Sequence, residues 1–132
     1  MHNLEFGIRH KYDDSVPGIT VPVHLEYQGS RVQFDAKIDT GAELCLFDRG
    51  YGEALGIEIE SGYRKELRTI NSTLVAYGHE VTLSILDLNF DLMAFFYEAP
   101  EIHRNVLGRQ GWLVKVRLGV VDYEQLVYIG SY

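Results

Sequence analysis

The sequence predicts a single, mainly β domain. Three observations favour this fold class. The length of 132 residues is usual for one domain, the apolar residues mostly recur at every second position, and short turn segments separate these alternating runs. Eight or nine short strands with one or two helical turns are therefore expected, arranged as a mainly antiparallel β barrel or sandwich.

The clearest alternation lies in a hairpin near the start of the chain. In Arg31–Ile38 the apolar residues occupy one face, and the polar residues, Asp35 among them, occupy the other. Thr20–Tyr27 alternates in the same way, and Gln28-Gly29-Ser30 between the two runs has turn chemistry. The two runs are predicted to pair as antiparallel strands with one face exposed to water.

The other predicted elements are shorter or less regular. Asp48 is expected to cap a short helix that contains Glu53–Leu55 and ends at Gly56, and Arg109–Leu113 is expected to form a helical turn. The remaining strands are expected at Leu44–Phe47, Ile57–Glu60, Tyr63–Ile70, Thr73–Ile85, Asp87–Tyr97, Val114–Val120 and Gln125–Ile129.

Composition excludes several classes of partner. Twelve Lys and Arg stand against 19 Asp and Glu, which gives a net charge of −7 and argues against binding to nucleic acid or to an anionic membrane surface. No apolar run has the length of a membrane span, and the first residues do not resemble a signal peptide. With Cys45 as the single cysteine, these features favour a cytoplasmic protein.

One short motif has the residue types needed for catalysis. Asp39-Thr40-Gly41-Ala42 follows the strand that ends at Ile38. At the end of a strand, Asp39 can supply a carboxylate, Thr40 can hydrogen-bond to a second copy of the loop, and Gly41 lets two such loops approach closely. This arrangement suits one half of an aspartic protease active site.

Further residues, in order along the chain, match the same kind of protein. Leu55-Gly56-Ile57 ends the predicted helix, Thr69-Ile70-Asn71-Ser72 falls at a hairpin tip, and Val106-Leu107-Gly108-Arg109 precedes Trp112-Leu113. Together with the motif at Asp39, this series over roughly residues 20–130 resembles the retropepsin-like aspartic proteases, which include the retroviral proteases.

The resemblance implies a fold, an activity and an assembly. It implies a closed antiparallel β barrel with one or two short helices over residues 18–132, with residues 1–17 as either a dimer strand or a tail. Because the chain has one Asp-Thr-Gly, it implies an aspartic endopeptidase that acts as a homodimer, with water activated between two Asp39 carboxylates that share a proton. It implies no metal and no other cofactor.

The resemblance also implies roles for particular residues. Thr40, Gly41 and Ala42 would support the catalytic loop, and Val106, Leu107, Gly108 and Arg109 would form the C-terminal motif. A flap at Thr69, Ile70, Asn71, Ser72 and Thr73 would close over an extended peptide or protein substrate and pair with its backbone. Arg109 has two interpretations, a contact with a carboxylate near the dimer interface or an ordinary surface position.

Other chemistry has weaker support in the residues. Asp35 is interpreted as a solvated or cross-strand partner, Asp48 as a cap, and Cys45 as a buried small hydrophobe rather than a nucleophile. The five histidines show no zinc-ligand spacing. Two other functions remain open: a non-catalytic retropepsin-like module for peptide binding or dimerisation, and an unrelated small β barrel that binds a small ligand.

Overall fold

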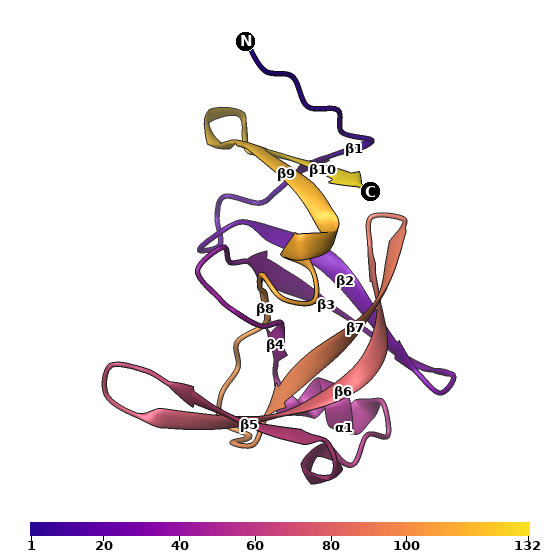
Figure 1. Ribbon diagram of the computed structural model, residues 1–132, viewed down its shortest axis with the longest axis vertical. Coiled ribbons are helices and arrows are strands. Elements are labelled where there is room, and N and C mark those ends of the chain that lie inside the picture. The colour runs from indigo at the N-terminus through magenta and orange to yellow at the C-terminus, as the bar shows by residue number, and fades with distance from the viewer.

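The computed structural model describes residues 1–132, and β-strands are its main regular structure (Figure 1). The predicted mainly β class is confirmed. One α-helix, α1 (Arg49–Ala54), is accompanied by 3₁₀ turns at Ile59–Ser61, Leu113–Lys115 and Asp122–Glu124. The strands are β1 (Ile8–Lys11), β2 (Thr20–Tyr27), β3 (Ser30–Ile38), β4 (Leu46–Phe47), β5 (Tyr63–Arg68), β6 (Thr73–Ile85), β7 (Leu88–Tyr97), β8 (Val106–Leu107), β9 (Val116–Val121) and β10 (Leu126–Ser131).

Seven strands form one sheet in the order β2-β3-β8-β4-β7-β6-β5. The sheet curls until β2, already paired with β3, also pairs with β6 over four residues, and β5 continues beyond this pairing as an edge strand. Most pairings are antiparallel, but β8 runs parallel to β3, and β4 runs parallel to β7. The predicted mainly antiparallel arrangement thus holds, with these two pairings as exceptions. In each of them a long stretch of chain separates the paired strands, so the second strand can enter the sheet in either direction.

The smaller sheet has the order β1-β10-β9 and lies at the end of the molecule where both termini are found (Figure 1). Residues 1–17 contain β1, and its four residues pair antiparallel with β10 of the same chain. Tyr12, which follows β1, is buried in the main core. Part of the N-terminal segment thus belongs to the folded body.

The core confirms the alternation predicted for the first hairpin. Phe34 and Ala36 are buried, whereas Asp35 is exposed on the opposite face of β3. The turn between β2 and β3 consists of Gln28 and Gly29, both with positive φ, a conformation that matches the right-handed twist of the two strands. None of the helices is long and apolar enough to cross a membrane.

The α-helix lies where the local sequence signals predicted it. Asp48 is the N-cap, and its side chain accepts a hydrogen bond from Gly50 N at 2.8 Å, as predicted. The helix begins at Arg49, directly after this cap, and Gly56 follows its C-cap with a φ of +81°.

Two other predicted elements are wrong in type or place. The strand expected at Ile57–Glu60 is a loop leading into a 3₁₀ turn at Ile59–Ser61, because its two buried isoleucines pack on the core without a partner strand. The helical turn expected at Arg109–Leu113 lies later, at Leu113–Lys115, because the backbone of Arg109 and Gln110 is bonded to the loop after β3.

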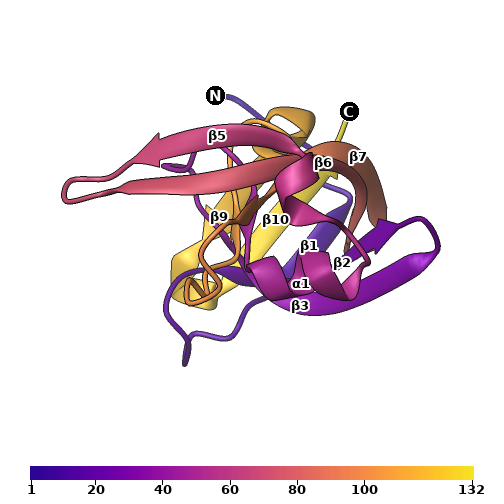
Figure 2. The same cartoon turned by 90° about the horizontal axis from the view of Figure 1, so that it is seen from below.

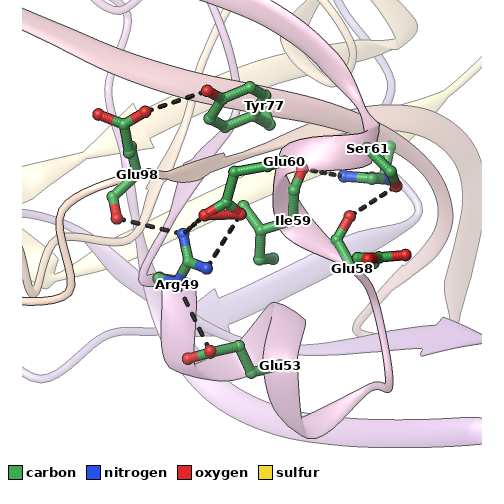
Figure 3. A network of polar contacts seen from close by, with 9 residues as sticks. Arg49, Glu53, Glu58, Ile59, Glu60, Ser61, Tyr77 and Glu98 are labelled. Atoms are coloured by element: carbon green, nitrogen blue, oxygen red, sulfur yellow. Dashed lines mark hydrogen bonds and ion pairs between the residues drawn. The ribbon is translucent and has the colours of Figure 1, made fainter.

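A network around Arg49 ties α1 to the base of the β5–β6 hairpin (Figure 3). The Arg49 guanidinium contacts both carboxylate oxygens of Glu60, at 2.7 and 3.0 Å, and lies 3.5 Å from Glu53. It also donates to the carbonyl oxygen of Glu98 at 3.2 Å, and the carboxylate of Glu98 accepts a hydrogen bond from Tyr77. Three segments far apart in the sequence therefore meet at one guanidinium.

We expect Arg49→Ala to lower Tm by about 3–6 °C, because a two-pronged, partly shielded ion pair is lost together with a bond to a main-chain carbonyl. Arg64→Ala is the matched control. Arg64 pairs with Glu66 at 3.1 Å, but both side chains are 53% exposed, so its loss should shift Tm by less than about 1 °C. Thermal unfolding followed by circular dichroism measures both variants, and equal shifts would contradict the assigned role.

A second contact links the two ends of the chain. It makes the free energy of unfolding depend on pH in the alkaline range. The Tyr12 hydroxyl donates to the carboxylate of Asp122, and this bond, with burial and the nearby negative charge, raises the pKa of Tyr12 from 10.0 to about 12. The folded state therefore favours the protonated phenol. The stabilisation is complete below pH 10 and is lost as the pH rises from about 10 to about 12.

We therefore expect Tyr12→Phe to be less stable than wild type below pH 10, with a difference that shrinks as the pH approaches 12. Urea unfolding of both proteins at several pH values between 8 and 12 gives the two free energies of unfolding. Using the difference between the two proteins removes the effect of other tyrosines. A difference that stays constant over this range would show that the Tyr12–Asp122 contact does not change the titration of Tyr12.

Candidate active site

Asp39 lies in a tight loop directly after β3. Its backbone N–H donates to Leu107 O at 3.0 Å, and its carbonyl oxygen accepts from Ala42 N at 3.2 Å. One carboxylate oxygen accepts a hydrogen bond from Gly41 N at 2.9 Å. The loop is therefore fixed by main-chain bonds on both sides of Asp39, and the half-buried carboxylate keeps a defined direction.

The segment around β8 positions the Asp39 loop, and β8 itself lies between β3 and β4 in the sheet. Beyond β8, Arg109 N donates to Ala42 O at 2.9 Å and Gln110 N donates to Glu43 O at 2.7 Å. Gly108 lies so close to the loop that an added Cβ would stand 2.1 Å from Leu44 O and 2.8 Å from Ala42 O. Two motifs more than 60 residues apart in the sequence are thus brought into direct main-chain contact.

The outer side of this loop opens to solvent. Thr40 and Gly41 are exposed and line a surface hollow, whose other lining residues are Glu43, Arg109, Gln110, Leu113 and Val114. Val114 is 71% exposed, which is high for a large aliphatic residue. Arg109 forms no ion pair within its own chain. This face presents the Asp-Thr-Gly loop with apolar and cationic groups beside it.

The expected flap residues lie at the tip of the hairpin formed by β5 and β6. This hairpin projects from the body of the molecule in both views (Figures 1 and 2). Thr69 N donates to Ser72 O at 2.8 Å, the Thr69 hydroxyl accepts from Ser72 N at 3.1 Å, and Ile70 between them is fully exposed. β5 ends at Arg68, two residues before the predicted limit at Ile70, and β6 begins at Thr73.

Three polar residues that sequence reasoning missed connect the hairpin with the Asp39 loop. Glu43 lies 3.7 Å from Lys65 Nζ on β5 and accepts a hydrogen bond from Gln110 Nε2 at 3.3 Å. Glu43 could have been found because it follows Ala42 directly. Lys65 gives no such signal, since its partner is distant in the sequence.

Comparisons with known proteins give a result for structure and none for sequence. No family model and no curated protein matches the sequence. Among solved structures, the chain is similar to the crystal structure of a retropepsin-like aspartic protease from Rickettsia conorii. The TM-score is 0.66 at 14% sequence identity, and the match covers 92% of this chain and 96% of that one. The chain has a retropepsin-like fold.

In the retropepsin-like fold of this chain, Tyr97 is a further residue whose titration responds to the charge of Asp39. It ends β7 and is 3% exposed. Burial raises the pKa of its hydroxyl; the charge of Arg104 opposes this shift, and that of Asp39 adds to it. Burial is thus the main reason that the Tyr97 hydroxyl keeps its proton, and the negative charge of Asp39 adds to it.

The alternative catalytic groups do not form a second site. Asp35 is exposed, and Asp48 caps α1 while contacting His103 at 2.6 Å. Cys45 is fully buried, and burial raises the pKa of its thiol to about 11, so it is the buried small residue that was predicted. Among the candidate groups, the loop at Asp39 is where a carboxylate, exposed backbone and a surface hollow coincide.

Proposed function

We propose that this chain is an aspartic endopeptidase that acts as a homodimer. The observation that carries the proposal is the Asp39 loop, which main-chain bonds hold in place while Thr40 and Gly41 stay exposed at its outer side. A second copy of the loop can approach this exposed side across a two-fold axis. The retropepsin-like fold supports this assignment.

The chemistry follows from two carboxylates placed close together. Asp39 and Asp39 of the partner subunit cannot both ionise at short range, so they share one proton. The ionised carboxylate takes a proton from a water molecule as its oxygen attacks the carbonyl carbon of the peptide. The protonated carboxylate donates to the carbonyl oxygen. The tetrahedral intermediate then breaks its C–N bond, and the departing nitrogen receives the proton that the first carboxylate took from water. The second carboxylate takes back its proton as the carbonyl re-forms, so the pair again shares one proton.

The remaining residues hold the loop and the substrate. Thr40 keeps the two loops in register by hydrogen bonding, and Gly41 directs the Asp39 carboxylate through its backbone N–H. The tip at Thr69–Thr73 closes over an extended peptide and pairs with its main chain. Closure then excludes water and orients the bond to be cut.

The test is cleavage of a diverse peptide library between acidic and neutral pH. Wild type is assayed beside Asp39→Asn, over protein concentrations that span the monomer–dimer transition measured by analytical ultracentrifugation. We expect cleavage to appear with the dimer, to require Asp39, and to follow the protonation of a coupled carboxylate pair.

Other results would point to other functions. A confirmed dimer that binds peptides without cutting them would favour the non-catalytic peptide-binding module. A monomer that neither binds nor cuts peptides would favour an unrelated ligand-binding role. Equal cleavage by wild type and Asp39→Asn would exclude Asp39 as the catalytic residue.

A further inference from the structure

A second surface hollow lies between the β5–β6 hairpin and the start of β4. Leu44, Phe95, Met93 and Tyr63 supply its apolar surface. Leu44 and Phe95 are buried, but Tyr63 is 66% exposed and Met93 is 39% exposed. An aromatic ring and a methionine thus face water beside a buried apolar floor, which is the composition of a binding site for a side chain.

A glycine in the middle of the sheet creates the room for this hollow. Gly78 on β6 lies opposite Tyr63 on β5 and opposite Phe95 on β7. A Cβ at Gly78 would stand 2.8 Å from the Phe95 ring and 2.9 Å from the Met93 sulfur. Because Gly78 has no side chain, the side chains of Phe95 and Met93 have room to lie across β6 at this position.

The hollow adjoins the candidate catalytic loop. Leu44 is five residues after Asp39, and Gln110 lines both this hollow and the one beside Thr40 and Gly41. The hairpin that carries the flap forms the opposite wall. A peptide lying between the flap and Asp39 therefore passes over this hollow.

Lys65 is the one cation in the wall of the hollow. Its only carboxylate partner is Glu43, and the ion pair between them is weak. Lys65 Nζ lies 3.7 Å from Glu43, whose side chain is 58% exposed and is shared with Gln110. An exposed pair of this kind contributes little to stability, so an incoming carboxylate can replace Glu43 at small cost. The hollow therefore combines apolar walls with a cation that is available for exchange.

We propose that Lys65 is a specificity-determining residue that makes this hollow select a glutamate side chain of the substrate, an inference that rests on the proposed peptidase function. The aliphatic stem of glutamate lies against Leu44, Phe95 and Met93, and its carboxylate pairs with Lys65 in place of Glu43. Aspartate has one methylene fewer than glutamate for the same apolar contacts. A lysine side chain would bring a second cation beside Lys65, with Glu43 as the one carboxylate between them.

The test compares peptides that differ only in having glutamate, glutamine or lysine at one position, scanned along the best library substrate. Each is cleaved by wild type, by Lys65→Glu and by the control Arg68→Glu. Arg68 has the same charge on the same strand but lies on the opposite, exposed face. At one position we expect wild type to prefer glutamate over lysine by about 3–10-fold in kcat/KM, Lys65→Glu to reverse the preference, and Arg68→Glu to keep it.

Binding of the same peptides, labelled with a fluorophore, gives a readout that does not need cleavage. Fluorescence anisotropy on Asp39→Asn and on the Asp39→Asn/Lys65→Glu double variant should show the same preference and the same reversal. Cleavage with a preference that ignores Lys65 would overturn this inference and leave the peptidase proposal standing. A binding preference that depends on Lys65, without any cleavage by wild type, would support this inference and overturn the peptidase proposal. Neither cleavage nor binding would overturn both.

Discussion

Asp39→Asn is expected to lower kcat/KM for the best peptide substrate by at least about 10³-fold while leaving the fold and the dimer intact. Asparagine keeps the size of the side chain, and its amide oxygen can still accept the hydrogen bond from Gly41 N. What is lost is the carboxylate that takes a proton from water. Initial cleavage rates, with circular dichroism and sedimentation as checks of structure, measure this effect.

Asp35→Asn is the matched control, because Asp35 is an exposed aspartate on the same strand that leads to Asp39. It should cut at the wild-type rate.

The requirement for two subunits gives a further readout. With random pairing, an equal amount of Asp39→Asn added to wild type leaves about one quarter of dimers with two Asp39 residues and about halves the rate. A rate that does not change on mixing would mean that one subunit suffices.

Gly108→Ala is expected to destabilise the fold by about 3 kcal/mol or more, which lowers Tm by about 10 °C or more. The added methyl would stand 2.1 Å from Leu44 O and 2.6 Å from Leu44 C. Both are main-chain atoms of the segment that holds the Asp39 loop, so no side-chain rotation can relieve the overlap. The main chain directly after β8 and that of the loop must separate, and the bond from Arg109 N to Ala42 O weakens.

Gly7→Ala tests whether the effect belongs to the site or to any glycine. A Cβ at Gly7 would meet nothing within 4 Å, so this variant should stay within about 0.5 kcal/mol of wild type. Urea unfolding of the two variants beside wild type gives the free energies. A Gly108→Ala protein as stable as Gly7→Ala would show that the close approach of β8 to the Asp39 loop is not needed for folding.

Local patterns predicted those parts of the fold that depend on neighbouring residues. The β2–β3 hairpin followed from alternation and a two-residue turn, and the start of α1 followed from Asp48 as a side-chain cap. The place of Asp39 at the end of a strand was also readable, because the strand before it alternates so clearly. In each of these cases the bonds that define the element lie within a few residues of one another.

Contacts between distant segments were beyond local patterns. Nothing in the periodicity of Val106-Leu107 shows that this pair of residues enters the sheet between β3 and β4, parallel to one and antiparallel to the other. The apolar alternation of Ile57 and Ile59 predicted a strand, but no other strand is available to pair with it there. The pairing of β1 with β10 was likewise undetermined.

A mainly β chain with one carboxylate motif at a strand end could be predicted from the residues alone, because alternation and turn chemistry are encoded in adjacent residues. The packing of Gly108 on the Asp39 loop and the contact of Lys65 with Glu43 became visible in the folded chain alone. Such contacts form when chain segments far apart are brought together by burial of the shared core, and the residues that meet there need no common pattern along the sequence.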